Sequence, residues 1–302
     1  MTLLATREVL TREQWTAEAE AHALRADALT ADHRARASRA QKHPVEDFLF
    51  TYYSYKPAIL RRWHPGPGVL LEQADERAGW RWYRAEGDGV EVDAARFRAE
   101  RGSMYRGVVN LLRATRDRPA QFGCFGLHEW EMAYRADEVR HAVPLRLGRD
   151  GTDAVVEAHD LKCTHFDAFR FFTPEAVPLN RTPLRRDDQV AREQPGCLHA
   201  GMDVYKWAVK LGPLVPGALL LDAFELARDI RTLDMQASPY DLTGWGYVPV
   251  AIETPEGKAE YVARQRGLSE RGQALRRAVI TAVTGPDDTP GCADFLPSQS
   301  VL

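Results

Sequence analysis

Histidines gather in the middle of the chain, where five of the nine lie between His128 and His199. The densest stretch is residues 159–167, which read His-Asp-Leu-Lys-Cys-Thr-His-Phe-Asp. In a strand, alternate residues share a face, so His165 and Asp167 would point the same way, on the face with most of the apolar bulk. Burying such groups without partners costs roughly 1–3 kcal/mol each. We therefore expect a metal ion, a substrate or a hydrogen-bond network to satisfy them.

Two histidines and an aspartate supply the ligand types of a mononuclear iron site. His165 and Asp167 are two residues apart, and His199 follows further along the chain. This set matches a two-His, one-carboxylate arrangement, and zinc accepts the same donors. The spacing is permissive, so a satisfied polar network at the end of a sheet is the alternative. Divalent iron or zinc is the cofactor expected on the metal reading.

Carboxylates and a histidine are the candidate catalytic groups. Asp167 and His165 come first because of their position in the dense stretch. Glu129 is a further candidate for a general base. It belongs to a His-Glu-Trp sequence that is not the His-Glu-x-x-His zinc signature, because residue 132 is Met.

Several aromatic and charged side chains are candidates for binding a substrate. Residues 45–55 are rich in aromatic residues, and an Arg-Arg-Trp sequence precedes a rigid Pro-Gly turn at residues 65–68. A helix predicted to begin at His199 carries Asp203 on its polar stripe, and the loop at residues 234–241 mixes carboxylates, hydroxyls and an aromatic ring. Core packing and solvated surface are the alternatives for these residues. The predicted binding residues are Tyr52, Tyr53, Arg61, Arg62, Trp130, Phe166, Phe169, Asp203 and Tyr240.

Helices are predicted at both ends of the chain and strands in between. Thr11 and Gln14 form the pattern of a capping box, which predicts a helix to about residue 29, and Thr30 can cap a second helix through residue 41. The remaining helices are expected at residues 94–116, at two positions within residues 196–235, and at residues 255–281. Strands are expected in residues 69–93 and in much of residues 122–172, where Arg-Asp-Gly at residues 149–151 has the composition of a hairpin turn.

This order of elements favours an α+β fold with a central, mostly antiparallel sheet between N-terminal and C-terminal helices. We expect an N-terminal helical segment at residues 1–42, a single α+β catalytic domain at residues 43–283, and a loose tail at residues 284–302. The 302 residues are 44% hydrophobic, which suffices for a large core without disulfides.

Composition excludes several classes of protein. The formal net charge of −3 is unlike that of a dedicated nucleic-acid binder, so contact with DNA would need a local basic patch. The four cysteines form no Cys-x-x-Cys pair. No stretch approaches the roughly 20 apolar residues of a membrane span, and the first residues do not read as a signal peptide. A cytoplasmic protein is expected, without a membrane or a known protein partner.

Four segments, at residues 43–53, 127–130, 162–172 and 234–241, resemble those of an actinobacterial family commonly labelled 3-methyladenine DNA glycosylase. The resemblance covers about residues 10–275. It implies hydrolysis of the N-glycosidic bond of an alkylated purine in DNA, without a required cofactor. The chain lacks the helix-hairpin-helix with a catalytic Asp and the zinc-holding termini of the well-understood glycosylases, so no catalytic residue carries over from them.

A glycosylase mechanism would have to use the residues of this chain. Aromatic walls would stack an extruded cationic base, with Phe171 joining the aromatic residues already named. Asp167 or Glu129 would be the carboxylate, and Arg61, Arg62, Arg185 and Arg186 would meet phosphates. The rival prediction is a metal-dependent oxygenase or hydrolase that acts on a small molecule through His165, Asp167 and His199. A third reading is a ligand-binding module without catalysis.

Overall fold

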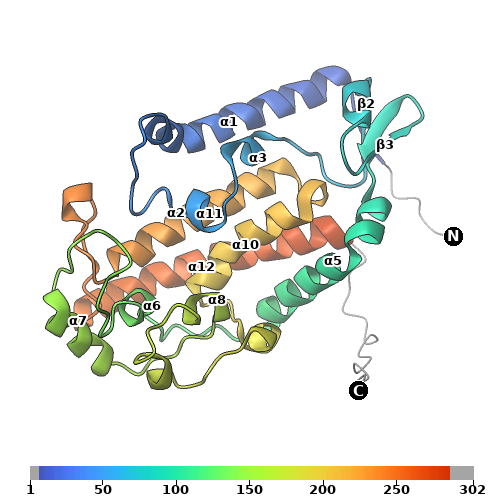
Figure 1. The fold of residues 1–302 in the computed structure, drawn as a ribbon. Helices are drawn as coiled ribbons and strands as arrows, with labels where there is room; N and C mark the ends of the chain where they lie inside the picture. Colours follow the sequence, from blue (N-terminus) through green and yellow to red (C-terminus); the bar gives the residue numbers. More distant parts are fainter. Residues whose placement is uncertain (1–6, 286–302) are drawn as a thin grey trace.

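The computed structural model describes residues 7–285, which form a mostly helical protein with one small sheet (Figure 1). Five long helices dominate: α1 (Arg12–Ser38), α5 (Ala94–Asp117), α10 (Leu198–Leu211), α11 (Gly217–Gln236) and α12 (Pro255–Thr284). Shorter helices are α2 (Phe48–Tyr52), α3 (Pro57–Arg61), α4 (Asp75–Ala78), α6 (His128–Glu131), α7 (Gly148–Glu157), α8 (Phe166–Phe169) and α9 (Gln189–Arg192). The 3-10 turns are η1 (Val177–Leu179), η2 (Arg186–Asp188), η3 (Gly212–Leu214) and η4 (Thr243–Trp245).

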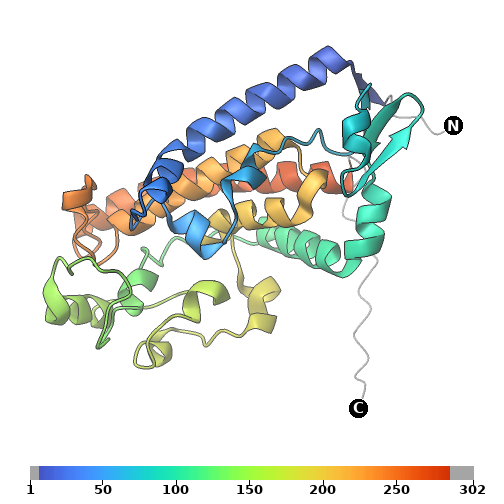
Figure 2. The same ribbon diagram turned by 45° about the horizontal axis from the view of Figure 1, so that its top comes forward.

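Helices α10, α11 and α12 form the middle of the molecule. In both views α1 lies on one side of them and the green and yellow segment, residues 118–197, on the other (Figures 1 and 2). The apolar stripe of α11 is buried, including Leu226, Ile230 and Leu233. A Cβ atom on Gly201 of α10 would lie 2.9 Å from the Cδ1 atom of Ile230, so α10 and α11 approach closely at this point and a side chain there would displace the end of Ile230.

The sheet has the strand order β1-β2-β4-β3. Strand β1 (Glu8–Leu10) pairs in parallel with β2 (Val69–Glu72), whereas β2 pairs antiparallel with β4 (Gly89–Val92), and β4 with β3 (Tyr83–Glu86). The α+β class is therefore confirmed in its coarse form, as are the strands expected in residues 69–93. The sheet lies at one end of the long helices, beside the starts of α1 and α5, and not in the middle of the molecule (Figure 2).

A buried arginine in an aromatic cage fixes the corner between the sheet and α1. Arg77 is 5% exposed, and its guanidinium carbon lies 4.8, 5.0 and 4.6 Å from the ring centroids of Trp15, Trp63 and Trp80. The Arg77 Nη1 donates to the carbonyl oxygen of Trp63 at 3.2 Å. Beside the cage, His64 Nδ1 and the Tyr83 hydroxyl are 2.8 Å apart. Burial lowers the pKa of His64 to about 3, with the charges of Arg62 and Arg77 acting in the same direction.

The strands predicted within residues 122–172 are wrong. The expected hairpin turn lies inside α7, and residues 158–165 are an irregular extended segment. The side chain of Asn180 makes the two backbone hydrogen bonds that a neighbouring strand would make. Its Oδ1 accepts from the Cys163 amide at 2.8 Å, and its Nδ2 donates to the Cys163 carbonyl at 3.2 Å. With the backbone satisfied in this way, the segment needs no sheet.

The helix predictions are mostly confirmed. The capping box is present, with Gln14 N 3.3 Å from Thr11 Oγ1 and Thr11 N 2.9 Å from Gln14 Oε1. One helix, α1, replaces the two that were expected, because Thr30 donates its hydroxyl to the carbonyl oxygen of Ala26 and does not cap a new helix. The predicted tail lies, apart from residues 284 and 285, outside the described residues. Within residues 7–285, no helix is long and apolar enough to cross a membrane.

Candidate functional site

Polar side chains of α10 and α11 meet those of the segment at residues 118–197 in the interior of the protein. His128 lies in α6, and His165 stands at the N-cap position of α8. His199 and Asp203 are one turn apart on α10, and α11 contributes Asp234 near its C-terminal end. The site therefore lies where the irregular residues 118–197 pack against the long helices.

The first cluster, which we call the His128 group, consists of His128, His199 and Asp234. Each offers one ligand atom, and these atoms lie within 4.8 Å of one another. The Nε2 atom of His128 is 3.4 Å from Asp234 Oδ2, and the His128 and His199 ring centroids are 4.0 Å apart in a T-shaped arrangement. Asp234 is 1% exposed, so its charge depends on these neighbours.

The second cluster, the His165 group, consists of His165, Glu193 and Asp203, and its ligand atoms also lie within 4.8 Å of one another. The Nε2 atom of His165 is 3.3 Å from both Glu193 Oε1 and Asp203 Oδ2. All three residues are buried. The ring centroid of His199 is 5.4 Å from that of His165, so His199 joins the two groups.

The three histidines differ in protonation. Burial by itself lowers the pKa of His128, but Asp234 and Glu129 outweigh it and raise the pKa to about 10. His165 likewise has a raised pKa, because Glu193 and Asp203 overcome the effect of burial.

His199 is the neutral member of the site. Burial and the positive charges of His128 and His165 hold its pKa well below the usual value. A neutral imidazole offers a lone pair, which is what a metal ion or a proton donor requires.

Two cations of the chain balance the buried carboxylates. Arg231 Nη1 donates to Glu129 Oε1 at 2.6 Å and to Asp234 Oδ2 at 2.8 Å. Lys206 Nζ lies 2.5 Å from Asp203 Oδ2 and 3.1 Å from Asp167 Oδ2. Burial would raise the pKa of Asp203, but Lys206 and His165 lower it, so the carboxylate stays ionised.

Two hollows meet at the wall formed by His128 and His199, which line both of them. The first, which we call the central pocket, is narrow, with a volume of about 30 Å³, which is room for about two water molecules. It is lined by Phe48, Tyr52, Tyr53, His128, Glu129, Met132, Arg140, His165, Asp167, Ala168, Phe171, His199, Met202, Asp203 and Arg231.

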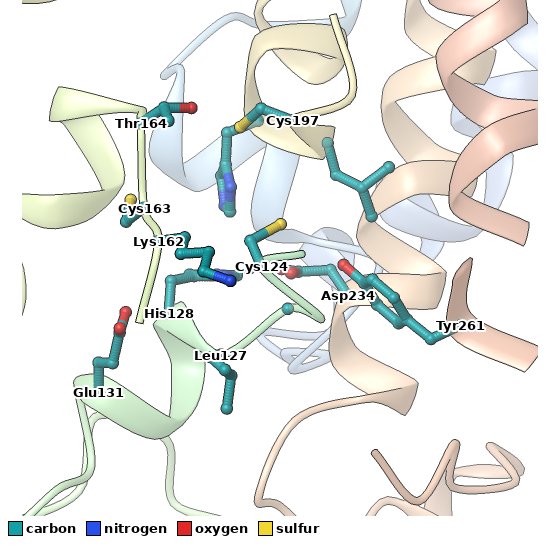
Figure 3. A pocket seen from close by; sticks show the side chains of 13 residues that line it. Cys124, Leu127, His128, Glu131, Lys162, Cys163, Thr164, Cys197, Asp234 and Tyr261 are labelled. Atoms are coloured by element: carbon teal, nitrogen blue, oxygen red, sulfur yellow. Dashed lines mark ion pairs between the residues drawn. The ribbon is translucent and has the colours of Figure 1, made fainter. Parts of the chain in front are cut away.

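The second hollow, the cysteine pocket, is shown in Figure 3, where Cys124, Cys163 and Cys197 approach from different segments opposite Asp234 and Tyr261. Burial raises the pKa values of all three thiols, so they are protonated and neutral at physiological pH. Burial also raises the pKa of Glu131 to about 8. The cysteine pocket is thus lined by uncharged thiols and does not offer thiolate ligands.

His165 and Asp167 both line the central pocket, together with His128 and His199. Glu129, Asp203, Tyr52 and Tyr53 also line this pocket. Glu129 is ion-paired with Arg231, and Arg231 lowers its pKa although burial opposes this. Tyr53 donates its hydroxyl to Asp203 Oδ1 at 2.7 Å.

The predicted metal set of His165, Asp167 and His199 is not the one that the structure assembles. His165 precedes a helix and does not lie in a strand, so the argument from alternating residues of a strand does not apply to His165 and Asp167. Asp167 faces Lys206 and lies outside both His/carboxylate groups found among the described residues.

Several predicted binding residues lie elsewhere. Trp130 is fully buried and donates its Nε1 to the Ala237 carbonyl, and Phe169 is buried in the apolar core. Phe166 packs against that core under the guanidinium of Arg186, and Tyr240 is buried beside His141. Arg61 pairs with Asp27, and Arg62 stacks on Trp80 beside a different hollow. None of these residues lines the central pocket among the residues that the structure describes.

Arg231 and Glu193 were not predicted, and Asp234 was singled out only as part of the loop at residues 234–241. Arg231 and Asp234 carry charges on a helix that is otherwise buried, and an ion pair three residues apart on such a helix is a usable signal. Glu193 lies after α9 in a polar, irregular stretch, where nothing in the sequence distinguishes it from a surface residue.

Comparison with known proteins gives no further guide, since no family model, no curated protein and no solved structure matches the chain.

Proposed function

We propose that the protein is a metal-dependent enzyme that acts on a small molecule in the central pocket, with the ion held by the His128 group. The observation that carries this proposal is the convergence of two histidines and a carboxylate from α6, α10 and α11, with ligand atoms within 4.8 Å. His128, which its raised pKa makes an imidazolium, would release its proton on binding the ion. This is the ligand set of non-haem iron oxygenases, and zinc accepts the same donors. We favour an oxygenase, and a hydrolase if zinc is the ion retained.

The unused bonding capacity of the two groups favours the His128 group over the His165 group. Both oxygens of Asp203 are occupied, one by Tyr53 and the other by Lys206. By contrast, a carboxylate oxygen of the His128 group, Asp234 Oδ1, is buried without a hydrogen-bond partner in residues 7–285, whereas in the His165 group the buried atom without such a partner is the ring nitrogen Nδ1 of His165. A buried carboxylate oxygen of this kind is costly unless a cation or donor meets it.

The chain's own residues would organise the reaction around such an ion. Bound iron supplies activation of dioxygen, and bound zinc supplies an activated water. His199 lines the central pocket, so a substrate there lies next to the ligand set. Arg231 fixes Asp234 and Glu129 in place, and the aromatic side chains of Phe48 and Tyr52 exclude water from one wall.

Metal content tests this proposal. Purified protein is loaded with iron(II), zinc or manganese(II) in turn, desalted and assayed by inductively coupled plasma mass spectrometry. We expect about one ion per chain in the wild type, and an affinity lower by at least about a hundredfold in Asp234→Asn. The matched control is Asp203→Asn, which alters the His165 group and is expected to keep the ion. Retention of the ion in Asp234→Asn but not in Asp203→Asn, or no ion in the wild type, contradicts the proposal.

Excision of an alkylated base is the second candidate, and the aromatic wall of the central pocket favours it. Phe48 and Tyr52 stack with ring centroids 5.1 Å apart, and Phe171 completes the wall. The purified protein should then release 3-methyladenine from alkylated duplex DNA, and its binding to DNA should weaken steeply with salt. Base release at the level of a buffer control, without salt-sensitive binding, rules this candidate out.

A further inference from the structure

A larger hollow, which we call the outer groove, adjoins the central pocket. It is lined by residues 40–44, which follow α1, and by residues 140–143. Its volume of about 760 Å³ lies within the usual range for small ligands, whereas the central pocket has room for about two water molecules. Phe48 and Arg140 line both hollows, so the groove meets the central pocket at these two side chains. The body of an organic molecule therefore fits the groove, and only a small end of it fits the central pocket.

The side chains that line the outer groove leave it positively charged. Lys42 and Arg140 both line it, and neither has a carboxylate at ion-pair distance in the part of the chain that the structure describes. Asp47 is the one carboxylate of the lining within residues 7–285. Arg36 and His33 lie 2.8 and 2.9 Å from its Oδ1 atom, and a backbone amide donates to its Oδ2 atom at 2.8 Å. Two cations of the groove therefore lack an anion of the protein, which favours an anionic ligand.

Arg140 stands where the groove meets the central pocket, and most of its donors are unused. Its guanidinium carbon lies 4.4 Å from the ring centroid of Phe171. The one hydrogen bond found for its side chain among the described residues joins Nη1 to the Sδ atom of Met132 at 3.5 Å. A thioether sulfur is a weak acceptor, so this contact does not neutralise the cation. A planar guanidinium with free donors is the group that binds a carboxylate or a phosphate through two parallel hydrogen bonds.

Two further rings of the groove offer an N–H donor and an apolar face. His43 Nδ1 accepts from the backbone amides of residues 45 and 46 at 3.2 and 3.1 Å, so the proton of the neutral ring lies on Nε2. Burial lowers the pKa of His43, which favours this neutral form. The ring of Trp245 lies 4.9 Å from that of His43 in a T-shaped arrangement, and Trp245 is 45% exposed. A tryptophan left open in this way can contact the flat body of a ligand.

We propose that the outer groove binds the body of the substrate, an organic anion with a flat apolar part. Arg140 binds its carboxylate or phosphate group, Lys42 adds positive charge, and Trp245 contacts the flat part. The reacting end lies beside Phe48, towards the central pocket, which itself admits only that end and about two water molecules. The inference rests on the proposed function, because it names the substrate class of that site, but the binding can be measured without a metal ion.

Calorimetric titration of the full chain tests this inference with probes that share a naphthalene ring. Naphthoate and naphthyl phosphate are the anions, naphthylmethanol is the neutral counterpart, and naphthylmethylammonium carries the opposite charge. We expect the anions to bind and the alcohol to bind at least about tenfold more weakly, since a charge-assisted hydrogen bond is lost. The ammonium probe should bind more weakly still. Binding of either anion supports the inference, and the tighter one identifies the group as a carboxylate or a phosphate.

Variants connect the binding to the named residues. Arg140→Gln should weaken anion binding by about tenfold, and Lys42→Gln by about threefold because Lys42 is exposed. Trp245→Ala should weaken the anions and the neutral alcohol alike, because it removes a contact to the body and not to the charge. The matched control is Arg39→Gln, since Arg39 is an exposed cation near Lys42 in the sequence but does not line the groove. Arg39→Gln should bind the anions as the wild type does.

The outcomes separate this inference from the proposed metal function. The titrations are run on protein treated with a chelator, and the folded state of each variant is checked by circular dichroism. Anion binding that Arg140→Gln and Lys42→Gln weaken supports the inference even if no ion is retained, in which case only the metal function fails. An ion retained by the His128 group without anion binding overturns the inference and leaves the metal function standing. Equal binding of the alcohol, unchanged affinity in both glutamine variants, or displacement of the probes by unmodified duplex DNA at lower concentration also overturns it.

Discussion

Arg77 and Arg231 are both buried guanidinium groups, 5% and 2% exposed, but the protein neutralises them in different ways. Arg77 lies among three tryptophan rings and a backbone carbonyl. Arg231 pairs with two buried carboxylates, and its guanidinium carbon lies 3.8 Å from the ring centroid of Phe48. One cation is held by aromatic faces, and the other belongs to a network of full charges.

The two cations also differ in how many buried polar atoms near them lack a hydrogen-bond partner. Within the described residues, the Arg77 corner has no buried side-chain polar atom without a partner, whereas the atoms around Arg231 include several. They are Arg231 Nε and Nη2, Glu129 Oε2, His141 Nε2 and Asp234 Oδ1. Polar atoms that the fold itself does not satisfy are expensive and often collect at functional sites, which is why the proposed function is placed at the centre and not at the corner.

The largest effect is expected from removing the central cation. Arg231→Met leaves Glu129 and Asp234 buried without their partner, which should lower the free energy of unfolding by about 3–5 kcal/mol. Chemical denaturation of metal-free protein measures it. Adding Glu129→Gln and Asp234→Asn should recover part of the loss, because both carboxylates are then replaced by neutral amides and burial returns His128 to its neutral form. A triple variant no more stable than Arg231→Met contradicts the charge network.

Arg77→Met should cost less, about 2 kcal/mol, because the loss of desolvated cation–π contacts leaves no buried charge behind. The control is Arg81→Met, since Arg81 also lies over a ring, that of Trp82 at 4.3 Å, but is well exposed. That change should stay within about 0.5 kcal/mol. A loss in Arg77→Met as large as in Arg231→Met would remove the distinction between the two regions.

Because His64 is buried beside the Arg77 cage, we expect the free energy of unfolding to depend on pH. His64 has a pKa of about 3 in the folded protein, lowered mainly by burial, against an ordinary value of 6.5. Its neutral form therefore adds stability above pH 6.5, and this stability is lost as the pH falls below 6.5 towards 3. Between about pH 7.5 and pH 5.5 the wild type should lose about 1.4 kcal/mol more than His64→Gln. Equal losses in the two proteins, measured by urea unfolding, would assign the pH dependence to other groups.

The smallest effect is expected at the pocket edge. Asp167→Asn removes the one carboxylate among several cations, and because its partners Arg170 and Arg186 are well exposed, stability should fall by at most about 1 kcal/mol. Urea unfolding measures this change. A loss in Asp167→Asn as large as that in Arg231→Met would place Asp167 in the buried charge network.

Local pattern predicted the helices well and the middle of the chain poorly. The periodicity of α11 and the Gly-Pro segment before it are local signals, and both elements are present. The alternation of residues 159–165 is equally local, but the Asn180 side chain, 17 positions away from Cys163, satisfies the backbone in place of a strand. Such a contact cannot be predicted from the residues of the segment alone.

The same limit applies to the site. His165 and His199 could be selected because histidines are dense in that stretch, and Asp203 because it shares a helix stripe with His199. Their partners Glu193 and Asp234 come from other elements and meet them only through the packing of α10 against α11 and residues 118–197. Asp167 was chosen for its spacing, which has meaning only in a strand.

Gly201 lies at a close contact between α10 and α11, the two helices that carry residues of both His/carboxylate groups. It lies between His199 and Asp203 on α10, so this helix carries one member of each His/carboxylate group. A single added methyl group at Gly201 would meet Ile230 at 2.9 Å, on the helix that bears Asp234. A side chain at this position would therefore have to displace the end of the Ile230 side chain, between the two helices that carry His199, Asp203 and Asp234.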